Sequence, residues 1–412
     1  MSDHSSDDVS LETATLVQPN HPDSNSPPTS PSSSFNLLNS PFLAGLLITA
    51  EVVGTGILSL PFFCSILTKP WGITYLLLNI VINYYAGIRL THSASVVEKR
   101  EGIIVRDLLE LSKYTSHHSL TLLIYYLNLL LVMGSYLLTI SSSLSSLIYP
   151  HIILHTILTG FIAIILIGLS LKYRTMSKLG RLPTYVSIIT ITLVVLFCIL
   201  GAQSSTSSPP INPLQIPSSL AGISFAVSSQ KLLLNVRASM TIEAKSEINY
   251  SLSLALALYG FFYILTILSA PDDEPLLLNV LENGTVLKRL TSLLLSIHLI
   301  ISFTINCQCF NSSLTSYTSL SYPKKAALTC FSVWLVANGV PFFDDLTSFI
   351  GAVTTIPLTL ILPVLYALTT DENVTKGFDK KLTWGIVSGS FIITVCGVLS
   401  SVWKINNDWK TI

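Results

Sequence analysis

The sequence predicts an all-α integral membrane protein with about eleven transmembrane helices. Half of its 412 residues are hydrophobic, only 11% are charged, and the mean hydropathy is +0.64. A typical water-soluble domain carries about a quarter charged residues. Several stretches contain no charged residue and can each hold an apolar span of about 20 residues. Three examples are Leu182–Gln230, Leu290–Pro323 and Leu382–Trp403.

Eleven apolar segments, separated by polar or basic connections, are long enough to cross a bilayer. They form one expected transmembrane domain over residues 41–403, followed by a short C-terminal tail over 404–412. In chain order the candidate spans are roughly 42–64, 71–92, 120–148, 151–171, 183–202, 219–239, 249–270, 290–313, 325–340, 346–369 and 382–403.

Residues 1–40 differ from the rest of the chain. They are rich in Ser, Pro, Asp and Asn, contain no Lys or Arg, and offer little that could form a core. A disordered tail is therefore expected. A cleavable secretory signal needs basic residues ahead of its apolar stretch, so we expect the first span to be retained.

The basic residues predict the orientation, because cytoplasmic loops hold an excess of Lys and Arg. A cytoplasmic N-terminus puts fourteen basic residues in cytoplasmic loops and five on the opposite side. The fourteen are Lys99, Arg100, Arg106, Lys113, Lys172, Arg174, Lys178, Arg181, Lys245, Lys324, Lys325, Lys376, Lys380 and Lys381; the five are Lys69, Lys288, Arg289, Lys404 and Lys410. The sequence thus predicts a cytoplasmic N-terminus and a C-terminus on the other side.

Charge and cysteine content argue against several classes of protein. A formal net charge of zero excludes a broadly basic surface for nucleic acid. The cysteines lie in or beside apolar segments, so a disulfide framework or a zinc site is not expected. No metal-ligand cluster or pairing of a nucleophile with His is evident at membrane depth, so we expect neither a cofactor nor an enzyme. The six cysteines are Cys64, Cys198, Cys307, Cys309, Cys330 and Cys396.

The first span has the pattern of a helix that unwinds within the membrane. The run Gly54–Pro61 holds two glycines and a proline, and Glu51 lies just ahead of it. An unwound segment exposes backbone N–H and C=O groups that can hold a ligand. Close approach of another helix is the alternative reason for such glycines.

The sixth span is irregular as well. The run Ala221–Lys231 begins apolar and turns polar where a continuous helix would face lipid. Transporters built from inverted repeats have interrupted helices at corresponding positions of their two halves, which makes the sixth span the partner of the first in a five-plus-five arrangement. A polar face turned toward the bundle interior is the alternative.

Three segments together resemble the amino acid/auxin permease family, and the resemblance covers about residues 40–403. The matching residues are Gly54–Pro61 in the first span, Ile223, Phe225, Ala226, Ser228, Ser229 and Gln230 in the sixth, and Val340–Ala352 at the entry to the tenth. Glu51, preceded by Leu47–Ala50, is most similar to the fungal neutral amino acid permease branch. Gln230 stands where many members have His. The resemblance implies a leucine-transporter-type fold with one extra helix.

The expected substrate is a free amino acid, whose carboxylate and ammonium must both be compensated. Unpaired N–H groups of Gly54, Thr55 and Gly56 at the start of a second half-helix can bind the carboxylate. Carbonyl groups around Phe225, Ala226 and Ser228 can accept hydrogen bonds from the ammonium. The residues named here are the predicted substrate site.

Glu51 is the candidate proton carrier, because an acid within a membrane is energetically expensive. The alternative is a structural acid bonded to another span, with Lys231 or Arg237 as its partner. His298 is a second titratable candidate, although a lone His on a helix face is more often a packing residue. Asn306 is the third coupling candidate. Oxygen ligands from the first and eighth spans offer sodium coupling as the second choice.

The function expected from these features is secondary active transport of neutral amino acids, coupled to protons, by alternating access around the first and sixth spans. The alternative from another class is a transporter-like amino acid sensor. Plasma membrane and a vacuolar or lysosome-like membrane are both open. Asn283 begins an acceptor sequence for N-glycosylation in a loop expected outside the cytosol. Asp344 and Asp345 are expected to cap the tenth span from solvent.

Overall fold

The structure, a computed structural model, describes residues 40–115, 117–148, 152–172, 181–201, 212–270, 276–315, 317–340, 342–370 and 377–410. All regular secondary structure within these ranges is helical, which confirms the predicted all-α class. The expected N-terminal tail lies outside the described residues, apart from Ser40.

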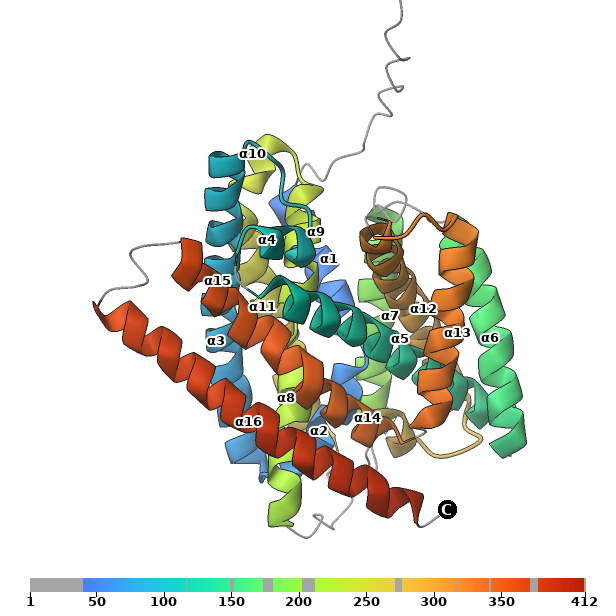
Figure 1. Cartoon of the computed structure of the whole chain (residues 1–412). Coiled ribbons are helices and arrows are strands. Elements are labelled where there is room, and N and C mark those ends of the chain that lie inside the picture. Colours follow the sequence, from blue (N-terminus) through green and yellow to red (C-terminus); the bar gives the residue numbers. More distant parts are fainter. Residues whose placement is uncertain are drawn as a thin grey trace, which may run out of the picture. The chain divides into compact units, whose positions relative to one another are not determined.

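The helices follow the predicted spans in order (Figure 1). They are α1 (Pro41–Val52), α2 (Gly56–Ile66), α3 (Lys69–Glu101), α4 (Leu108–Lys113), α5 (His118–Ile148), α6 (Ile152–Lys172), α7 (Arg181–Gly201), η2 (Pro213–Gln215), α8 (Ile216–Ala226), α9 (Gln230–Ala238), α10 (Ile242–Lys245), α11 (Ile248–Ser269), η3 (Leu277–Val280), α12 (Val286–Leu314), α13 (Tyr322–Gly339), α14 (Phe343–Ile350), η4 (Gly351–Thr355), η5 (Pro357–Ile361), α15 (Leu362–Thr370) and α16 (Gly377–Trp409).

Several helices are long and apolar enough to cross a bilayer. Within the described residues, 7 helices meet this criterion singly, and the bent pair α1 and α2 makes 8 if it counts as one span. The other predicted spans correspond to α6, to α8 followed by α9, and to α13. The count of eleven spans stays a prediction.

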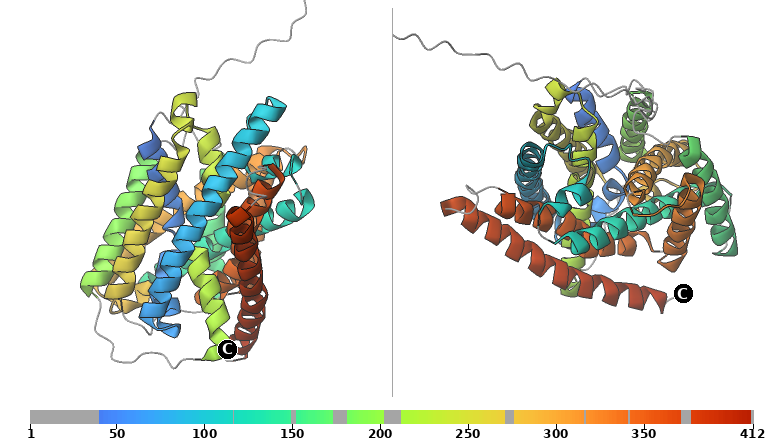
Figure 2. Two further views of the ribbon diagram at one scale, coloured as in Figure 1. Left: turned by 90° about the vertical axis from the view of Figure 1, so that its left-hand side faces the viewer. Right: turned by 45° about the horizontal axis from the view of Figure 1, so that its top comes forward.

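The helices of residues 40–410 pack in two groups (Figures 1 and 2). In one group, α5, α6, α12 and α13 contact one another, and α7 joins them through its contact with α12. In the other, α1 packs against α11, α2 and α11 pack against α3, α9 contacts α1 and α3, and α2 packs with α8. The segment from α14 to α15 contacts both groups, and the long helix α16 lies along α8, α14, η4 and η5.

Two helices are broken where the sequence predicts interruptions. Between α1 and α2 the chain leaves the helix over Val53–Thr55, and the two axes differ by 63°. Between α8 and α9 the break covers Val227–Ser229. Each break leaves terminal N–H and C=O groups without partners inside their own helix.

The predicted tenth span contains a further irregularity that the sequence reading did not anticipate. The segments η4 and η5 are π-helical. Pro357 begins η5 and has no backbone N–H to donate, which disturbs the regular α-helical ladder. A Cβ on Gly351 in η4 would overlap the carbonyl oxygen of Ala221 in α8, so the glycine permits this close contact. π-helical turns occur frequently at functional sites.

The prediction that Asp344 and Asp345 cap the tenth span from solvent is wrong. The N-cap residue of α14 is Phe342, and both aspartates are buried in the first turn. They form ion pairs with Lys404 of α16, in which the Lys404 ammonium lies 2.6 Å from Asp345 Oδ1. The reason is tertiary, because α16 continues to Trp409 and brings a lysine from beyond the predicted end of its span.

Candidate functional site

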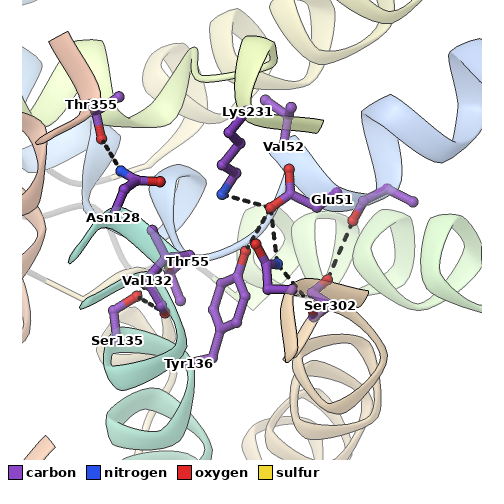
Figure 3. Close-up of polar contacts among 12 residues, drawn as sticks. Glu51, Val52, Thr55, Asn128, Val132, Ser135, Tyr136, Lys231, Ser302 and Thr355 are labelled. Carbon is purple, nitrogen blue, oxygen red and sulfur yellow. Dashed lines mark hydrogen bonds and ion pairs between the residues drawn. The ribbon is translucent and has the colours of Figure 1, made fainter. Parts of the chain in front are cut away.

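Glu51 is the centre of a buried polar cluster at the end of α1 (Figure 3). The residue is 1% exposed. The carboxylate oxygen Oε1 lies 2.7 Å from Lys231 Nζ and accepts hydrogen bonds from Asn306 Nδ2 at 3.1 Å and from the Tyr136 hydroxyl at 3.3 Å. These three partners come from α9, α12 and α5, so one oxygen connects both helix groups.

The second carboxylate oxygen of Glu51 has a different environment. Oε2 is buried and has no hydrogen-bond partner among the described residues. An unsatisfied buried acceptor is energetically unfavourable, and a carboxylate can relieve this by taking up a proton or a donor from a ligand. Oε1 of Glu51 is therefore fixed by three partners, whereas Oε2 can accept a proton or a hydrogen bond from a ligand.

The ion pair between Glu51 and Lys231 compensates for the unfavourable position of each charge at its helix end. Glu51 lies in the last turn of α1, near the negative end of that helix, and Lys231 lies in the first turn of α9, near a positive end. Each charge alone would be repelled by its own helix end. Arg237, the other predicted partner, instead pairs with Glu98 of α3.

Tyr263 of α11 lies between the two helix breaks. Its hydroxyl is 3.1 Å from the carbonyl oxygen of Val52 and 2.6 Å from that of Ala226. These carbonyls end α1 and α8, where no following turn supplies an N–H. A fully buried tyrosine thus connects the two interrupted helices. The sequence reading did not identify Tyr263, since a tyrosine in an apolar span gives little signal.

His298 of α12 has hydrogen bonds at both ring nitrogens. Nε2 lies 2.8 Å from the carbonyl oxygen of Val53, and Nδ1 lies 2.8 Å from the Ser187 hydroxyl of α7. Nε2–H can donate to the Val53 carbonyl oxygen, while Nδ1 can accept from the Ser187 hydroxyl or donate to the Ser187 carbonyl oxygen, which lies 3.1 Å away. In this geometry His298 supports the break between α1 and α2, as a packing residue would.

Asn306 and Ser302 occupy successive turns of the same α12 face. The Asn306 amide donates to the carbonyl oxygen of Ser302 at 2.9 Å as well as to Glu51. The Ser302 hydroxyl donates to the carbonyl oxygen of Ala50 at 3.4 Å. The predicted coupling residue Asn306 therefore positions the Glu51 carboxylate.

The predicted carboxylate-binding residues lie beside α5 and α8. The hydroxyl groups of Thr55 and Ser135 are 3.2 Å apart (Figure 3). A Cβ on Gly54 would lie 3.1 Å from the Tyr136 hydroxyl, and one on Gly56 would lie 2.6 Å from the Cα of Ala226. The structure thus brings the first break directly against the end of α8, and close helix approach by itself would require glycine at position 56.

The other predicted substrate residues are also buried at this junction. Phe225 and Ala226 form the last turn of α8, and Ser228 lies in the following break. Asn283 lies far along the chain in the exposed connection before α12. Its side-chain oxygen accepts a hydrogen bond from Lys288 at 2.8 Å. Asn283 therefore does not belong to the cluster around Glu51.

Asn128 extends the polar region toward the π-helical segment. Its amide donates to the hydroxyls of Thr354 at 2.9 Å and Thr355 at 3.2 Å. Its Oδ1 is buried and has no hydrogen-bond partner among the described residues. Figure 3 shows Asn128 and Ser135 on the α5 face that looks toward the first break. An amide within an apolar span is the signal that could have identified Asn128.

Comparisons with known proteins agree with this arrangement. The profile of a family described as transmembrane amino acid transporter protein matches residues 39–407. None of the curated protein sequences compared with this chain matches it.

Among solved structures, the crystal structure of the Eremococcus coleocola manganese transporter in complex with an aromatic bis-isothiourea substituted compound is similar, with 14% identity and a TM-score of 0.58. The match covers 90% of this chain and 91% of that chain. A mutant of the same transporter matches with 13% identity and a TM-score of 0.52, over 91% of this chain and 99% of that chain. At this identity the likeness concerns the fold alone, and it agrees with the predicted all-α membrane fold.

Proposed function

Because this chain belongs to the transmembrane amino acid transporter family, we propose that it moves neutral amino acids by proton-coupled alternating access. Membrane transport of amino acids by a multi-pass integral membrane protein follows from the family and the transporter fold. The neutral substrate class and the proton are the parts that we propose. An amino acid is the substrate, and no enzymatic reaction is assigned to the chain.

The state of Glu51 carries the proposal. One oxygen is held by Lys231 and by donors from the opposite helix group, whereas the other oxygen is buried without a partner. Protonation at Oε2 would remove the charge that attracts Lys231 and would weaken the bonds from Tyr136 and Asn306. Because those two residues belong to α5 and α12, a change of charge on Glu51 would alter how α1 is held against them. This links proton binding to relative movement of the two groups.

Substrate recognition is proposed at the two breaks. The N–H groups of Gly54, Thr55 and Gly56 lie at the positive start of α2, which suits a carboxylate. Carbonyl groups from Phe225 to Ser228 suit the ammonium. Since Tyr263 approaches the Ala226 carbonyl at 2.6 Å, an ammonium bound there would replace the tyrosine hydroxyl.

The charge of the site supports a neutral substrate. Glu51 and Lys231 neutralise each other, and a zwitterion with an uncharged side chain adds no net charge. A charged side chain would add a net charge to this buried, neutral site. Burial of a charge without a partner is energetically costly.

Sodium remains the alternative coupling ion. The Lys231 ammonium occupies the position beside Oε1 that a sodium ion would take, and the two cations would repel each other. Ser302 and Asn306 are already bonded to Ala50 and Glu51. These contacts favour the proton.

Orientation and location belong to the proposal as well. We propose a cytoplasmic N-terminus, supported by the excess of Lys and Arg in alternate loops. Plasma membrane and a vacuolar or lysosome-like membrane both accept such an orientation.

Uptake into proteoliposomes tests the proposal. A labelled amino acid panel is offered with an imposed pH gradient, with a sodium gradient, and with neither. Concentrative uptake of neutral amino acids driven by the pH gradient is the expected result. Uptake driven by sodium alone would contradict proton coupling, and saturable binding without uptake would favour the sensor.

A further inference from the structure

A second polar site lies away from the helix breaks, where α3 and α9 end. A cavity of about 460 Å³ opens there between α3, α9, α10 and the start of α11. Its lining combines cationic groups with hydroxyl and amide groups. Six of the lining residues are Thr91, Ser95, Lys99, Arg237, Lys245 and Asn249.

Glu98 organises the positive groups of this cavity. It accepts two hydrogen bonds from Arg237, at 2.8 and 3.0 Å, and one from Lys245 at 2.8 Å. The backbone N–H of Val105 also donates to it at 3.0 Å. The Arg237 side chain is 5% exposed, so the guanidinium is fixed in place at the cavity wall.

The cavity carries an excess of positive charge. Three cations, Lys99, Arg237 and Lys245, face one carboxylate, that of Glu98. Within the described residues Lys99 forms no ion pair, and the contacts of Lys245 leave some of its donors unused. An anionic group bound in the cavity would therefore gain attraction without displacing Glu98.

The location of the cavity is that of a membrane interface. It lies where the long helix α3 and the short helix α9 end and the long helix α11 begins, on the side predicted to be cytoplasmic. Ile242 lines it from the short helix α10 and is 92% exposed. An apolar residue beside a basic cavity at helix ends suits contact with a lipid acyl chain next to its headgroup. Basic pockets between transmembrane helices on this face are known to bind anionic headgroups.

We propose that this cavity binds a phosphate monoester group, with the phosphorylated headgroup of an anionic lipid as its source. Lys99 and Lys245 attract the phosphate, and Arg237 forms the fixed wall behind it. The proposal concerns a site distinct from the cluster at Glu51 and does not depend on which ion drives transport.

Binding by the full-length protein in phosphatidylcholine nanodiscs tests this site. The probes are short-chain phosphatidylinositol 4-phosphate and soluble inositol 1,4-bisphosphate. In a variant carrying both Lys99→Gln and Lys245→Gln, we expect the Kd for the lipid to rise by about fivefold for each lysine. The Lys99→Gln variant alone removes a cation that forms no ion pair, so its folding should be unaffected.

The matched control changes two exposed lysines outside the cavity, Lys324→Gln and Lys380→Gln, which are predicted to lie on the same side of the membrane. This variant should bind like the unchanged protein. If the lipid probe binds more tightly than the soluble probe and its binding depends on the two lysines, the site recognises a lipid headgroup. If both probes bind equally and both depend on the lysines, the site recognises phosphate from a soluble source. Equal weakening in both double variants, or no binding of either probe, would overturn the proposal.

Discussion

The Nζ atom of Lys231 lies 2.7 Å from Oε1 of Glu51, so one buried ion pair joins the end of α1 to the start of α9. Both side chains are almost inaccessible, with exposed fractions of 4% and 0%. A buried ion pair is not by itself a source of stability, but removal of one partner leaves an uncompensated charge. The pair therefore makes the two interrupted helices depend on each other.

Glu51→Gln should abolish concentrative, pH-driven uptake, because an amide cannot exchange a proton in the physiological range. Exchange of substrate across the membrane should survive, since carboxylate recognition by the Gly54–Gly56 backbone does not need the acid. The measurement is uptake against external pH, normalised to protein in the membrane. A variant that retains the original pH profile would show that Glu51 is a structural anchor.

Lys231→Met should destabilise the protein, because it leaves the Glu51 carboxylate buried without its cation. The loss in the free energy of unfolding should be about 3 to 5 kcal/mol if Glu51 stays charged. Combining it with Glu51→Gln should recover at least about 1 kcal/mol, which a double-mutant cycle of thermal stability measures. Lys324→Met, at an exposed lysine, is the control and should change little. Strictly additive effects of the two central substitutions would mean that the pair is not coupled.

Gly56→Ala should reduce uptake strongly, since its Cβ would lie 2.6 Å from the Cα and 2.9 Å from the Cβ of Ala226. Gly56→Val should abolish uptake. The informative comparison combines Gly56→Ala with Ala226→Gly. The second substitution removes the Ala226 Cβ, one of the two atoms that the new Cβ would overlap. Recovery of uptake would assign the glycine to helix packing. Continued loss, at normal protein abundance, would assign it to the approach of the substrate carboxylate.

Tyr263→Phe should lower the thermal stability, because the Val52 and Ala226 carbonyls would lose the single hydroxyl donor that they share. The expected loss is about 1 to 3 kcal/mol for a buried acceptor left unpaired. Tyr126→Phe in α5 is the control, since the Tyr126 hydroxyl is buried and has no hydrogen-bond partner among the described residues. Equal melting temperatures for the two variants would mean that the Tyr263 hydroxyl does not stabilise the breaks.

Asn283 should carry an N-linked glycan when the protein is made in a cell that glycosylates, because the residue is exposed in a connection predicted to face away from the cytosol. The mobility of the protein before and after glycosidase treatment, with Asn283→Gln as control, measures this. Asn373, which lies outside the described residues, begins a second acceptor sequence on the predicted cytoplasmic side. Glycan at Asn373 and none at Asn283 would reverse the orientation.

The sequence by itself determined the membrane class, the order of the helices and the two breaks. These features depend on local chemistry: apolar length sets a span, and the glycines and proline of Gly54–Pro61 interrupt one. It also predicted that Glu51 is a functional candidate with a compensating partner, because an acid within an apolar span is energetically expensive.

Only the tertiary structure decided which partner each buried charge has. The sequence offered two candidate cations for Glu51 on the same span. In the packed structure Lys231 pairs with Glu51, whereas Arg237 pairs with Glu98. Likewise, Lys404 of the long helix α16 pairs with Asp345, which the sequence analysis predicted to face solvent. The sequence shows which side chains are charged. The partner of each charge depends on contacts between segments far apart in the chain, and local sequence patterns do not encode those contacts.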